Sequence, residues 1–510
     1  PENHGLLLRK PGGLDDWYPA DIYFSSLAEL GGYTSWDKDN DMRYGEFPHD
    51  IGSFDYYPEV FVGRVLAYTD PEDGDPNEVT NWINKVLNYE KNPGNSSGLT
   101  RVFFSTARKA DNYDIDFQRY VRLSAPHYPL NFFCDTPVGL MPSATRDRIN
   151  DPFGTGWGWV NIFAHGEAAH WAPYYRDAHF FYSPTYPNEV DLNELTNTNR
   201  YFIVWSGACN NAAFDWAAEV PIYTDTTVCE GFLEAYPNKG AVAFFGNTRA
   251  PASPGSAFNF YPYLLDCIFT DGRVNYLLGP ALAWMKYDRF DPYNYYTGQG
   301  FVYFHNLFGS PLTEVWTNVP VQTTTTVSPN RIPVNQTRTV TVTVRYFNGE
   351  TYVPLSNARV TLYGCAIYRI GYTNAQGQVS FTITPTETGT IKATATKHDY
   401  KPSQANIYVG LKSEVASDVN LPPEFFMALS SSNPVKGNLK LQYGIPVEDE
   451  GPVSLKIYDV SGRSIKTVFS EEKSAGYYDL SIPTSSFSSG TYFLRLEARN
   501  KAKTEKVVIR

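Results

Sequence analysis

The stretch YFIVWSGACNN, residues 201–211, begins with five mainly apolar residues, continues with small ones and delivers a single cysteine. An apolar run of this length predicts a strand buried on both faces, and Ser206, Gly207 and Ala208 mark the point where the chain turns. In open parallel sheets, reactive side chains collect just beyond the carboxyl ends of the strands. The stretch therefore predicts a strand of a parallel sheet, with Cys209 at the reactive edge.

Similar apolar runs occur on both sides of this stretch. We predict further strands at residues 60–64 (VFVGR), 101–104 (RVFF), 160–164 (VNIFA) and 241–245 (AVAFF). Segments of helical length lie between several of them, and residues 78–90 place Val79, Ile83, Val86 and Leu87 at helical spacing. Alternation of buried strands and helices predicts a parallel α/β sheet in residues 1–318.

The composition changes near residue 319. Residues 319–410 alternate Thr and Val with polar residues and carry turn signals at FNGE and NAQGQ, which predicts a β-sandwich of about 100 residues, the size of an immunoglobulin domain. Residues 411–428 read as a linker. Residues 429–510 contain several short strands joined by turns, which predicts a second small β-sandwich.

Net charge, the length of apolar runs and cysteine content argue against several classes of protein. The 510 residues carry a formal net charge of −12, so no basic surplus exists to displace counterions from nucleic acid phosphates. No run of 18 apolar residues predicts a membrane-spanning helix. Five cysteines without a CxxC pair argue against a zinc site or a dense disulfide framework, and at least one thiol must be free.

A second strand end, in residues 160–166, presents His165 and Gly166. If its strand is a neighbour of the strand before Cys209, the imidazole and the thiol emerge side by side, and a nearby imidazole is the usual means of producing a thiolate. The backbone amides of Gly166 and Cys209 could then hold the oxyanion of a tetrahedral intermediate. Taken separately, a single Cys is more often an inert buried thiol and a lone His a satisfied core or surface residue.

Seven blocks in residues 15–318 together resemble the gingipain-type cysteine peptidases, which have a caspase-like fold. The blocks are YPADIYFSSL, YYPEVFVGR, KVLNYEKN, NIFAHGEAAHW, YFIVWSGACNNAAFD, KGAVAFFGNTR and NLFGSPLTEVW. The resemblance implies that Cys209 is the nucleophile and His165 the general acid and base of peptide-bond hydrolysis. It also implies additional strands before the first block, and therefore either an N-terminal fragment or propeptide that is cleaved off and stays associated, or a truncated sheet.

Two further roles follow from the same resemblance. A carboxylate that orients the histidine is expected after the RVFFST strand, where Arg108 and Lys109 occupy the matching offset and Asp111 is the nearest candidate. An acidic residue that reads a basic P1 side chain is expected slightly later, at Asp114 or Asp116, through a charge-assisted hydrogen bond. The alternative for these aspartates is capping of the helix that follows.

An acidic loop in residues 36–46 spaces carboxylates at alternate positions. Ca²⁺ prefers several such oxygens in one tight loop, although the pattern is not an EF-hand because Met42 replaces the turn glycine. The resemblance to gingipains implies an aspartate-rich loop here, so we expect Ca²⁺ bound by Asp37, Asp39, Asp41 and Glu46; the alternative is a solvated acidic turn.

The C-terminal unit resembles the sorting domain of type IX secretion, through the blocks LKIYDVSGR, AGYYDLSI, SSGTYFLRLEA and KVVIR. This resemblance implies the type IX machinery as a partner and an extracellular or cell-surface location in a bacterium. The middle sandwich resembles the immunoglobulin-like module that follows gingipain catalytic domains, with a supporting role.

We therefore predict a secreted cysteine endopeptidase that acts on proteins or peptides and prefers Arg or Lys at P1. The alternative is a catalytically inactive surface, adhesion or filament scaffold that reuses the peptidase fold.

Overall fold

The structure of the protein is a computed structural model. It describes residues 6–9, 15–18, 21–25, 57–66, 77–94, 97–106, 120–136, 142–150, 154–168, 170–174, 178–181, 190–214, 227–234, 236–249, 254–289, 300–410, 422–431, 433–446, 449, 451–473, 475–498 and 501–510. The chain divides into two compact units. The first comprises residues 1–321 with 398–401, and the second comprises residues 322–397 with 402–510.

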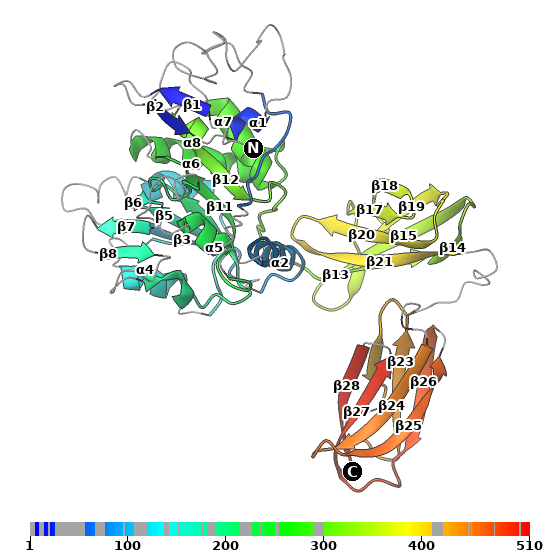
Figure 1. Cartoon of the computed structure of the whole chain (residues 1–510). Coiled ribbons are helices and arrows are strands. Elements are labelled where there is room, and N and C mark those ends of the chain that lie inside the picture. Colours follow the sequence, from blue (N-terminus) through cyan, green and yellow to red (C-terminus); the bar gives the residue numbers. More distant parts are fainter. Residues whose placement is uncertain are drawn as a thin grey trace. The chain divides into compact units, whose positions relative to one another are not determined.

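A six-stranded sheet forms the centre of the first unit (Figure 1). Its strands, in spatial order, are β12 (His305–Gly309), β11 (Ala241–Asn247), β10 (Phe202–Ser206), β5 (Trp159–Phe163), β3 (Arg101–Thr106) and β4 (Phe133–Asp135). The five strands from β11 to β4 pair in parallel, and β12 is antiparallel to β11. The predicted strands at 101–104, 160–164, 202–205 and 241–245 and their parallel pairing are thus confirmed.

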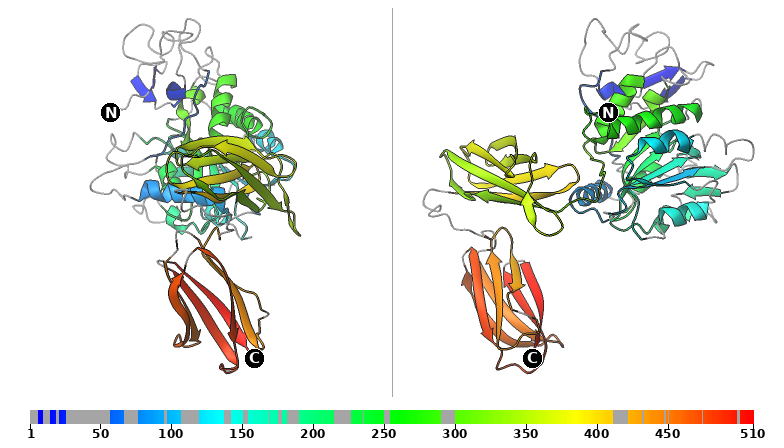
Figure 2. Two further views of the ribbon diagram at one scale, coloured as in Figure 1. Left: turned by 90° about the vertical axis from the view of Figure 1, so that its right-hand side faces the viewer. Right: turned by 180° about the vertical axis from the view of Figure 1, so that it is seen from behind.

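Each central strand contributes alternate side chains to two separate cores. On β10, Ile203 and Trp205 belong to one core and Phe202 and Val204 to the other, all at 0% exposure. One core is closed by helices α6 (Pro254–Phe269) and α7 (Leu278–Arg289), and the other by α4 (Pro142–Ile149) and α5 (Val228–Leu233). Figures 1 and 2 show these helices on the two sides of the strands. Burial on both faces explains why the strands read as unbroken apolar runs.

The first unit also contains shorter elements. Among the described residues, its other helices are α1 (Ile22–Ser25), α2 (Glu78–Lys91), α8 (Gly300–Phe304) and the 3₁₀ turns η1 (Ala125–His127) and η2 (Leu192–Glu194). One small sheet pairs β1 (Leu6–Arg9) with β2 (Asp15–Tyr18). Another contains β6 (His165–Glu167), β7 (His170–Tyr174), β8 (Ala178–Phe181) and β9 (Val190–Asp191).

The predicted strand at residues 60–64 is wrong. Arg64 alone makes a β-bridge there, to Phe308, while Val60 and Phe61 are more than a third exposed. A Cβ on Gly63 would lie 2.3 Å from the carbonyl oxygen of Gly309 and 2.8 Å from the Cδ of Pro311, so this segment passes close to the end of β12 without pairing along it.

The helix predicted at residues 78–90 exists as α2, but the predicted apolar residues are only partly buried. Ile83 and Leu87 are about 40% exposed, whereas Asn81, Lys85, Val86 and Tyr89 are buried. Lys85 is accepted in the interior because its Nζ donates to the carbonyls of Phe232, at 3.0 Å, and Lys239, at 3.1 Å.

The strands of residues 323–410 form two sheets. One contains β13 (Thr323–Ser328), β15 (Arg338–Phe347), β16 (Tyr352–Pro354) and, paired with β15, β19 (Gln378–Ile383). The other contains β14 (Arg331–Pro333), β21 (Tyr400–Gly410), β20 (Gly389–Lys397), β17 (Arg359–Gly364) and β18 (Ile367–Tyr372). On β15, Val340, Val342 and Val344 are at 0% exposure, which is the burial of every second residue expected when one face of a sheet is covered.

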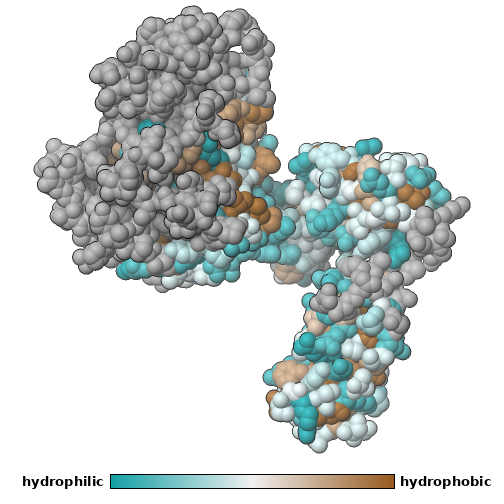
Figure 3. Space-filling view, in the orientation of Figure 1, coloured by the Kyte–Doolittle hydropathy of each residue, from teal (hydrophilic) through white to brown (hydrophobic). Residues whose placement is uncertain are grey.

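The strands of residues 426–509 also form two sheets. One contains β22 (Phe426–Leu429), β23 (Asn438–Ile445) and β26 (Gly476–Pro483), and the other β25 (Ser464–Lys473), β24 (Gly451–Asp459), β27 (Gly490–Ala498) and β28 (Lys501–Ile509). Alternate apolar side chains of both sheets, such as Leu441, Leu455 and Leu494, meet in one core. The visible surface of these strands is mainly hydrophilic, with scattered hydrophobic residues (Figure 3). No described helix is long and apolar enough to cross a membrane.

Candidate active site at the carboxyl edge of the sheet

The two strand ends predicted to carry the chemistry are direct neighbours. β10 pairs with β5 in parallel, with Ser206 opposite Ile162, and the amide of Gly207 donates to the carbonyl of Ile162 at 2.9 Å. Cys209 follows Ser206 by three residues, and His165 follows Ile162 by three. Both residues therefore follow the same edge of the sheet, each three residues after the paired residues Ser206 and Ile162.

Gly166 lies directly against the cysteine turn. A Cβ built on Gly166 would be 2.6 Å from Asn211 Nδ2, 2.8 Å from the carbonyl oxygen of Cys209 and 2.9 Å from the Cβ of Ala208. No side chain fits in that space, so the close approach of the two strand ends requires glycine. The backbone of His165 begins β6, opposite Ala172, and its side chain lies outside what the structure describes.

Cys209 lies on a turn at the end of β10, is partly exposed and takes part in no disulfide. The next residue, Asn210, has a φ of 56°, in the left-handed region that Asn tolerates better than most residues. The amide of Ala213 donates back to the Asn210 carbonyl at 3.0 Å and closes the turn. Small residues at 207 and 208 and an Asn at 210 thus allow a fully buried strand to end in a solvent-reachable thiol.

A buried hydrogen-bond chain supports one side of this turn. Trp171 Nε1 donates to Ser206 Oγ at 3.0 Å, and Ser206 Oγ donates to Asn211 Oδ1 at 2.7 Å. The backbone carbonyl of Asn211 accepts from the amide of Cys229, the second residue of α5, at 3.2 Å. The turn is therefore tied to the strand beneath it and to the following helix.

Asn247 and His305 support the other side. Asn247 ends β11, and His305 begins β12 directly opposite. Asn247 Nδ2 donates to the carbonyl of Ala208 at 2.9 Å, and His305 Nδ1 lies 2.7 Å from Asn247 Oδ1. Both side chains are fully buried.

The other four thiols are poor nucleophiles. Burial raises the pKa of Cys134 to about 11 and that of Cys267 to about 12. Burial also raises the pKa of Cys365, and that of Cys229 lies well above its ordinary value. Since the thiolate is the reactive form, none of these four is suited to attack a carbonyl at neutral pH.

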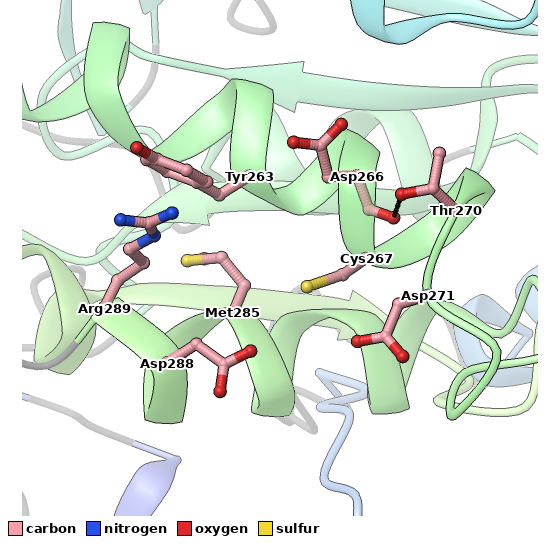
Figure 4. Close-up of a pocket in the computed structure, with 8 residues that line it drawn as sticks. All are labelled: Tyr263, Asp266, Cys267, Thr270, Asp271, Met285, Asp288 and Arg289. Carbon is pink, nitrogen blue, oxygen red and sulfur yellow. Dashed lines mark hydrogen bonds between the residues drawn. The ribbon is translucent and has the colours of Figure 1, made fainter.

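A pocket of about 230 Å³ is lined by α6, the turn after it and α7, and not by the ends of β5 or β10. In Figure 4 the sulfur of Cys267 lies between the carboxylates of Asp271 and Asp288. Arg273 binds both aspartates, Asp271 through Nε at 2.8 Å and Asp288 through Nη2 at 2.7 Å. This guanidinium already balances the carboxylates, and the thiol is protonated, so the group offers neither a nucleophile nor an open metal site.

The remaining predicted site residues lie outside the described part of the chain. They are Asp111, Asp114 and Asp116 of the expected histidine-orienting and P1-reading loop, and Asp37, Asp39, Asp41 and Glu46 of the expected Ca²⁺ loop. Their roles stay predictions.

Sequence reasoning missed the buried polar residues that support the turn: Trp171, Ser206, Asn211, Asn247 and His305. A usable signal existed at two of them, because Asn247 ends an otherwise apolar strand and His305 starts one. A buried polar side chain must find a hydrogen-bond partner. At the edge of the sheet that carries the predicted reactive residues, we could have expected that partner to belong to the turn that holds them.

An α/β fold with a partly exposed cysteine and a His-Gly pair at one sheet edge is the arrangement expected of a gingipain-type cysteine peptidase. The chain belongs to peptidase family C25, which it matches over residues 5–316. Residues 433–510 match the secretion system C-terminal sorting domain, so the protein is a secreted or cell-surface protein of the type IX pathway.

The curated relatives are Lys-gingipains of Porphyromonas gingivalis. Lys-gingipain HG66 is 25% identical over 380 residues, which are 70% of this chain and 20% of the relative. Another Lys-gingipain of this species is 27% identical over 196 residues, 38% of this chain and 10% of the relative. The chain thus spans about a fifth or less of the length of these relatives.

Solved structures share the fold. The Arg-specific cysteine proteinase gingipain R superposes with a TM-score of 0.52 at 17% identity, covering 70% of this chain and 76% of the other. The complex of Porphyromonas gingivalis RgpB pro- and mature domains superposes with a TM-score of 0.52 at 18% identity. This match covers 70% of this chain and 78% of the other. These likenesses confirm the expected mixed α/β fold of a gingipain catalytic domain.

Proposed function

We propose that the protein is a cysteine endopeptidase in which Cys209 is the nucleophile and His165 the general acid and base. The observation that carries the proposal is the pairing of β5 with β10, since it brings the chain at His165 and Gly166 against the turn that holds Cys209. Membership of peptidase family C25 supports the same reaction.

The proposed reaction begins when His165 takes the proton of Cys209 and the thiolate attacks the scissile carbonyl. The backbone amides of Gly166 and Cys209 donate to the developing oxyanion. His165 then gives its proton to the leaving amine, and water hydrolyses the thioester that remains on Cys209. Asp111 would orient the imidazole, as expected from its place after β3.

We also propose a preference for Arg or Lys at P1, read by Asp114 or Asp116. The support is the naming of relatives as Lys-gingipains and as an Arg-specific proteinase, and the acidic balance of the chain. A carboxylate at the base of the P1 pocket would pair with a cationic side chain through a charge-assisted hydrogen bond.

Peptide substrates test both proposals. Wild-type protein should cleave peptides with Arg or Lys at P1, and Cys209→Ala should lower the cleavage rate at least about 1,000-fold because the nucleophile is removed. Cys134→Ala, which removes a thiol of raised pKa, is the matched control and should keep its rate. A wild type that neither cleaves peptides nor reacts with a thiol-directed peptide probe would favour the scaffold alternative, and cleavage after apolar or acidic residues would refute the P1 preference.

A Ca²⁺ site in residues 37–46 is part of the proposal, resting on the alternating carboxylates of that loop. We expect EGTA to lower the melting temperature of the protein, and added Ca²⁺ to restore it, because a cation that binds only the folded state stabilises it. Asp39→Asn should reduce the restoring effect. Equal melting temperatures with EGTA and with Ca²⁺, measured by calorimetry, would remove the site.

We propose the domain arrangement expected from the sequence: a peptidase domain at 1–318, an immunoglobulin-like sandwich at 319–410, a linker at 411–428 and a sorting sandwich at 429–510. Two sheets in each of the β-rich segments support this division. The proposed partners are the type IX secretion machinery and a cleaved N-terminal fragment or propeptide, the latter supported by the fold's likeness to RgpB in complex with its pro-domain.

A further inference from the structure

Asn247 contacts the cysteine turn on both sides of Cys209. Its side-chain amide donates to the carbonyl of Ala208 at 2.9 Å, and its backbone carbonyl accepts from the amide of Ala212 at 3.1 Å. One residue at the end of β11 therefore holds the chain immediately before the thiol and three residues after it. Asn247 and its partners Ala208 and Ala212 are all at 0% exposure, so water does not compete for these hydrogen bonds.

Donor and acceptor chemistry allows a single orientation of the Asn247 amide. The Ala208 carbonyl can only accept, so the amide nitrogen must face it and the amide oxygen must face His305. His305 must then carry a proton on Nδ1 and donate it. Burial, with the Lys286 ammonium nearby, holds the pKa of His305 well below its ordinary value, so the ring is neutral and this is its one proton.

The His305 ring is itself fixed in place. It stacks on Phe245, with ring centroids 6.3 Å apart and ring planes inclined by 9°. Its centroid also lies 5.7 Å from that of the Trp205 ring. The next residue, Asn306, accepts a hydrogen bond from Lys286 Nζ at 3.1 Å. His305 therefore has little freedom to withdraw its donor from Asn247.

The consequence for Cys209 follows from the planarity of the peptide bond. In a trans peptide the carbonyl of Ala208 and the N–H of Cys209 point in opposite directions within one plane. When Asn247 holds the carbonyl, it also sets the direction of the Cys209 N–H. That N–H is one of the two proposed oxyanion donors. A donor stabilises the oxyanion only when it points at the position that the oxyanion will occupy.

We propose that Asn247, oriented by His305, is a positioning residue that aims the Cys209 amide at the oxyanion. This inference rests on the proposed role of Cys209. Asn247 touches no reacting atom, so its effect should appear in the transition state and not in substrate binding.

Asn247→Leu tests the clamp, because it keeps the backbone bond to Ala212 and a similar volume but removes the side-chain donor. We expect kcat to fall about 10- to 100-fold, somewhat less than the loss of a direct oxyanion donor, with KM changed less than about twofold. Amide hydrogen exchange in a peptide covering residues 207–214 should become faster in the variant. Unchanged kcat, or a change in KM alone, would overturn the proposal.

Two variants at His305 separate hydrogen bonding from packing. His305→Phe keeps the ring against Phe245 and Trp205 but has no donor, whereas His305→Asn keeps a donor at the δ position and loses the ring. The proposal expects His305→Phe to lose kcat like Asn247→Leu, and His305→Asn to keep most of its kcat despite a lower melting temperature. If kcat instead follows the melting temperature in the two variants, the residues are merely structural and the proposal fails.

Hydrogen exchange keeps this inference distinct from the proposed function. A wild type that hydrolyses no peptide refutes the proposed function, yet faster exchange of residues 207–214 in Asn247→Leu would still support the clamp. Unchanged exchange in that variant would overturn the clamp whether or not the wild type is active.

Discussion

Gly166 occupies the narrowest point between the two strand ends. Its Cα faces Asn211 Nδ2, the Cys209 carbonyl and the Ala208 Cβ, all within 3 Å of where a methyl group would be. Two of these three contacts belong to residues 208 and 209, so any added atom would push on the cysteine turn itself. At this scale the proposed site depends on the absence of a side chain at Gly166 as much as on the two proposed reactive groups.

Gly166→Ala should therefore lower kcat/KM for peptide hydrolysis at least about 100-fold. The added methyl must displace the Cys209 turn or the chain at His165, and small misplacements of reacting groups are costly. Gly272→Ala is the matched control, because a Cβ at Gly272 meets nothing within 4 Å. Steady-state kinetics measure the effect, and a Gly166→Ala protein with wild-type kcat/KM would contradict the tight approach of the two strand ends.

At the scale of elements, the short helix α5 connects the cysteine turn to α2. The first turn of α5 donates to the site edge, Val228 to the carbonyl of Ala168 at 2.8 Å and Cys229 to that of Asn211 at 3.2 Å. A capping box between Thr227 and Glu230 satisfies its other free amides. At the far end, the buried Lys85 of α2 donates to Phe232, in the last turn of α5.

Lys85 makes the stability of this connection depend on pH. Burial lowers the pKa of Lys85 to about 7 in the folded protein, against about 10.4 in an unfolded chain. Between these values the unfolded chain binds the extra proton, so the contribution of Lys85 to stability grows as the pH rises from about 7 towards 10 and is smallest below 7. A charged Glu234 would raise the pKa of Lys85. Burial raises the pKa of Glu234 itself to about 8, so at pH 7 it carries little of that negative charge.

Lys85→Met should be less stable than wild type at high pH, because the carbonyls of Phe232 and Lys239 lose their donor. We expect the difference in free energy of unfolding to shrink by up to about 1.4 kcal/mol per pH unit between pH 9 and pH 7. Denaturant unfolding across this range measures it. Lys91→Met, an exposed change at the end of the same helix, is the matched control. A difference that does not vary with pH for Lys85→Met would contradict the lowered pKa of Lys85.

At the scale of the whole molecule, the chain combines a peptidase fold with an export signal. The family C25 match ends at residue 316, and the sorting domain match begins at residue 433. The core of residues 425–507 is built from its own strands, with Leu441, Leu455 and Leu494 among its buried members. The matched sorting domain therefore shares one hydrophobic core with Phe425 and Met427, which lie just before it.

Removal of residues 433–510 should leave peptide hydrolysis unchanged and abolish export. In a bacterium with a type IX secretion system, we expect the truncated protein to be retained in the periplasm, as measured by immunoblots of periplasm, cell surface and medium. The control is a full-length chain with Tyr368→Ser, an exposed change outside both matched segments, which should be exported normally. Export of the truncated chain at the wild-type level would show that the sorting signal lies elsewhere.

The amino-acid sequence determined much of the sheet by itself. Apolar runs of strand length, each ending in small or polar residues, identified β3, β5, β10 and β11, because burial on both faces leaves a purely local signature. The proposed reactive residues were equally local in their signal, since His165-Gly166 and Cys209 follow their strands directly. The strand at 60–64 failed because pairing depends on the partner, and Arg64 is the residue of that segment that pairs with β12, through Phe308.

Only the tertiary structure decided which strands are neighbours and what supports the cysteine turn. The pairing of Ser206 with Ile162, the burial of Lys85 and the reach of Asn247 to Ala208, 39 residues away, all join segments that are distant in the chain. His305 contacts Asn247 across a further 58 residues. Such contacts leave no periodic pattern in either partner, because a buried polar side chain is stable only through the group that the fold happens to place beside it.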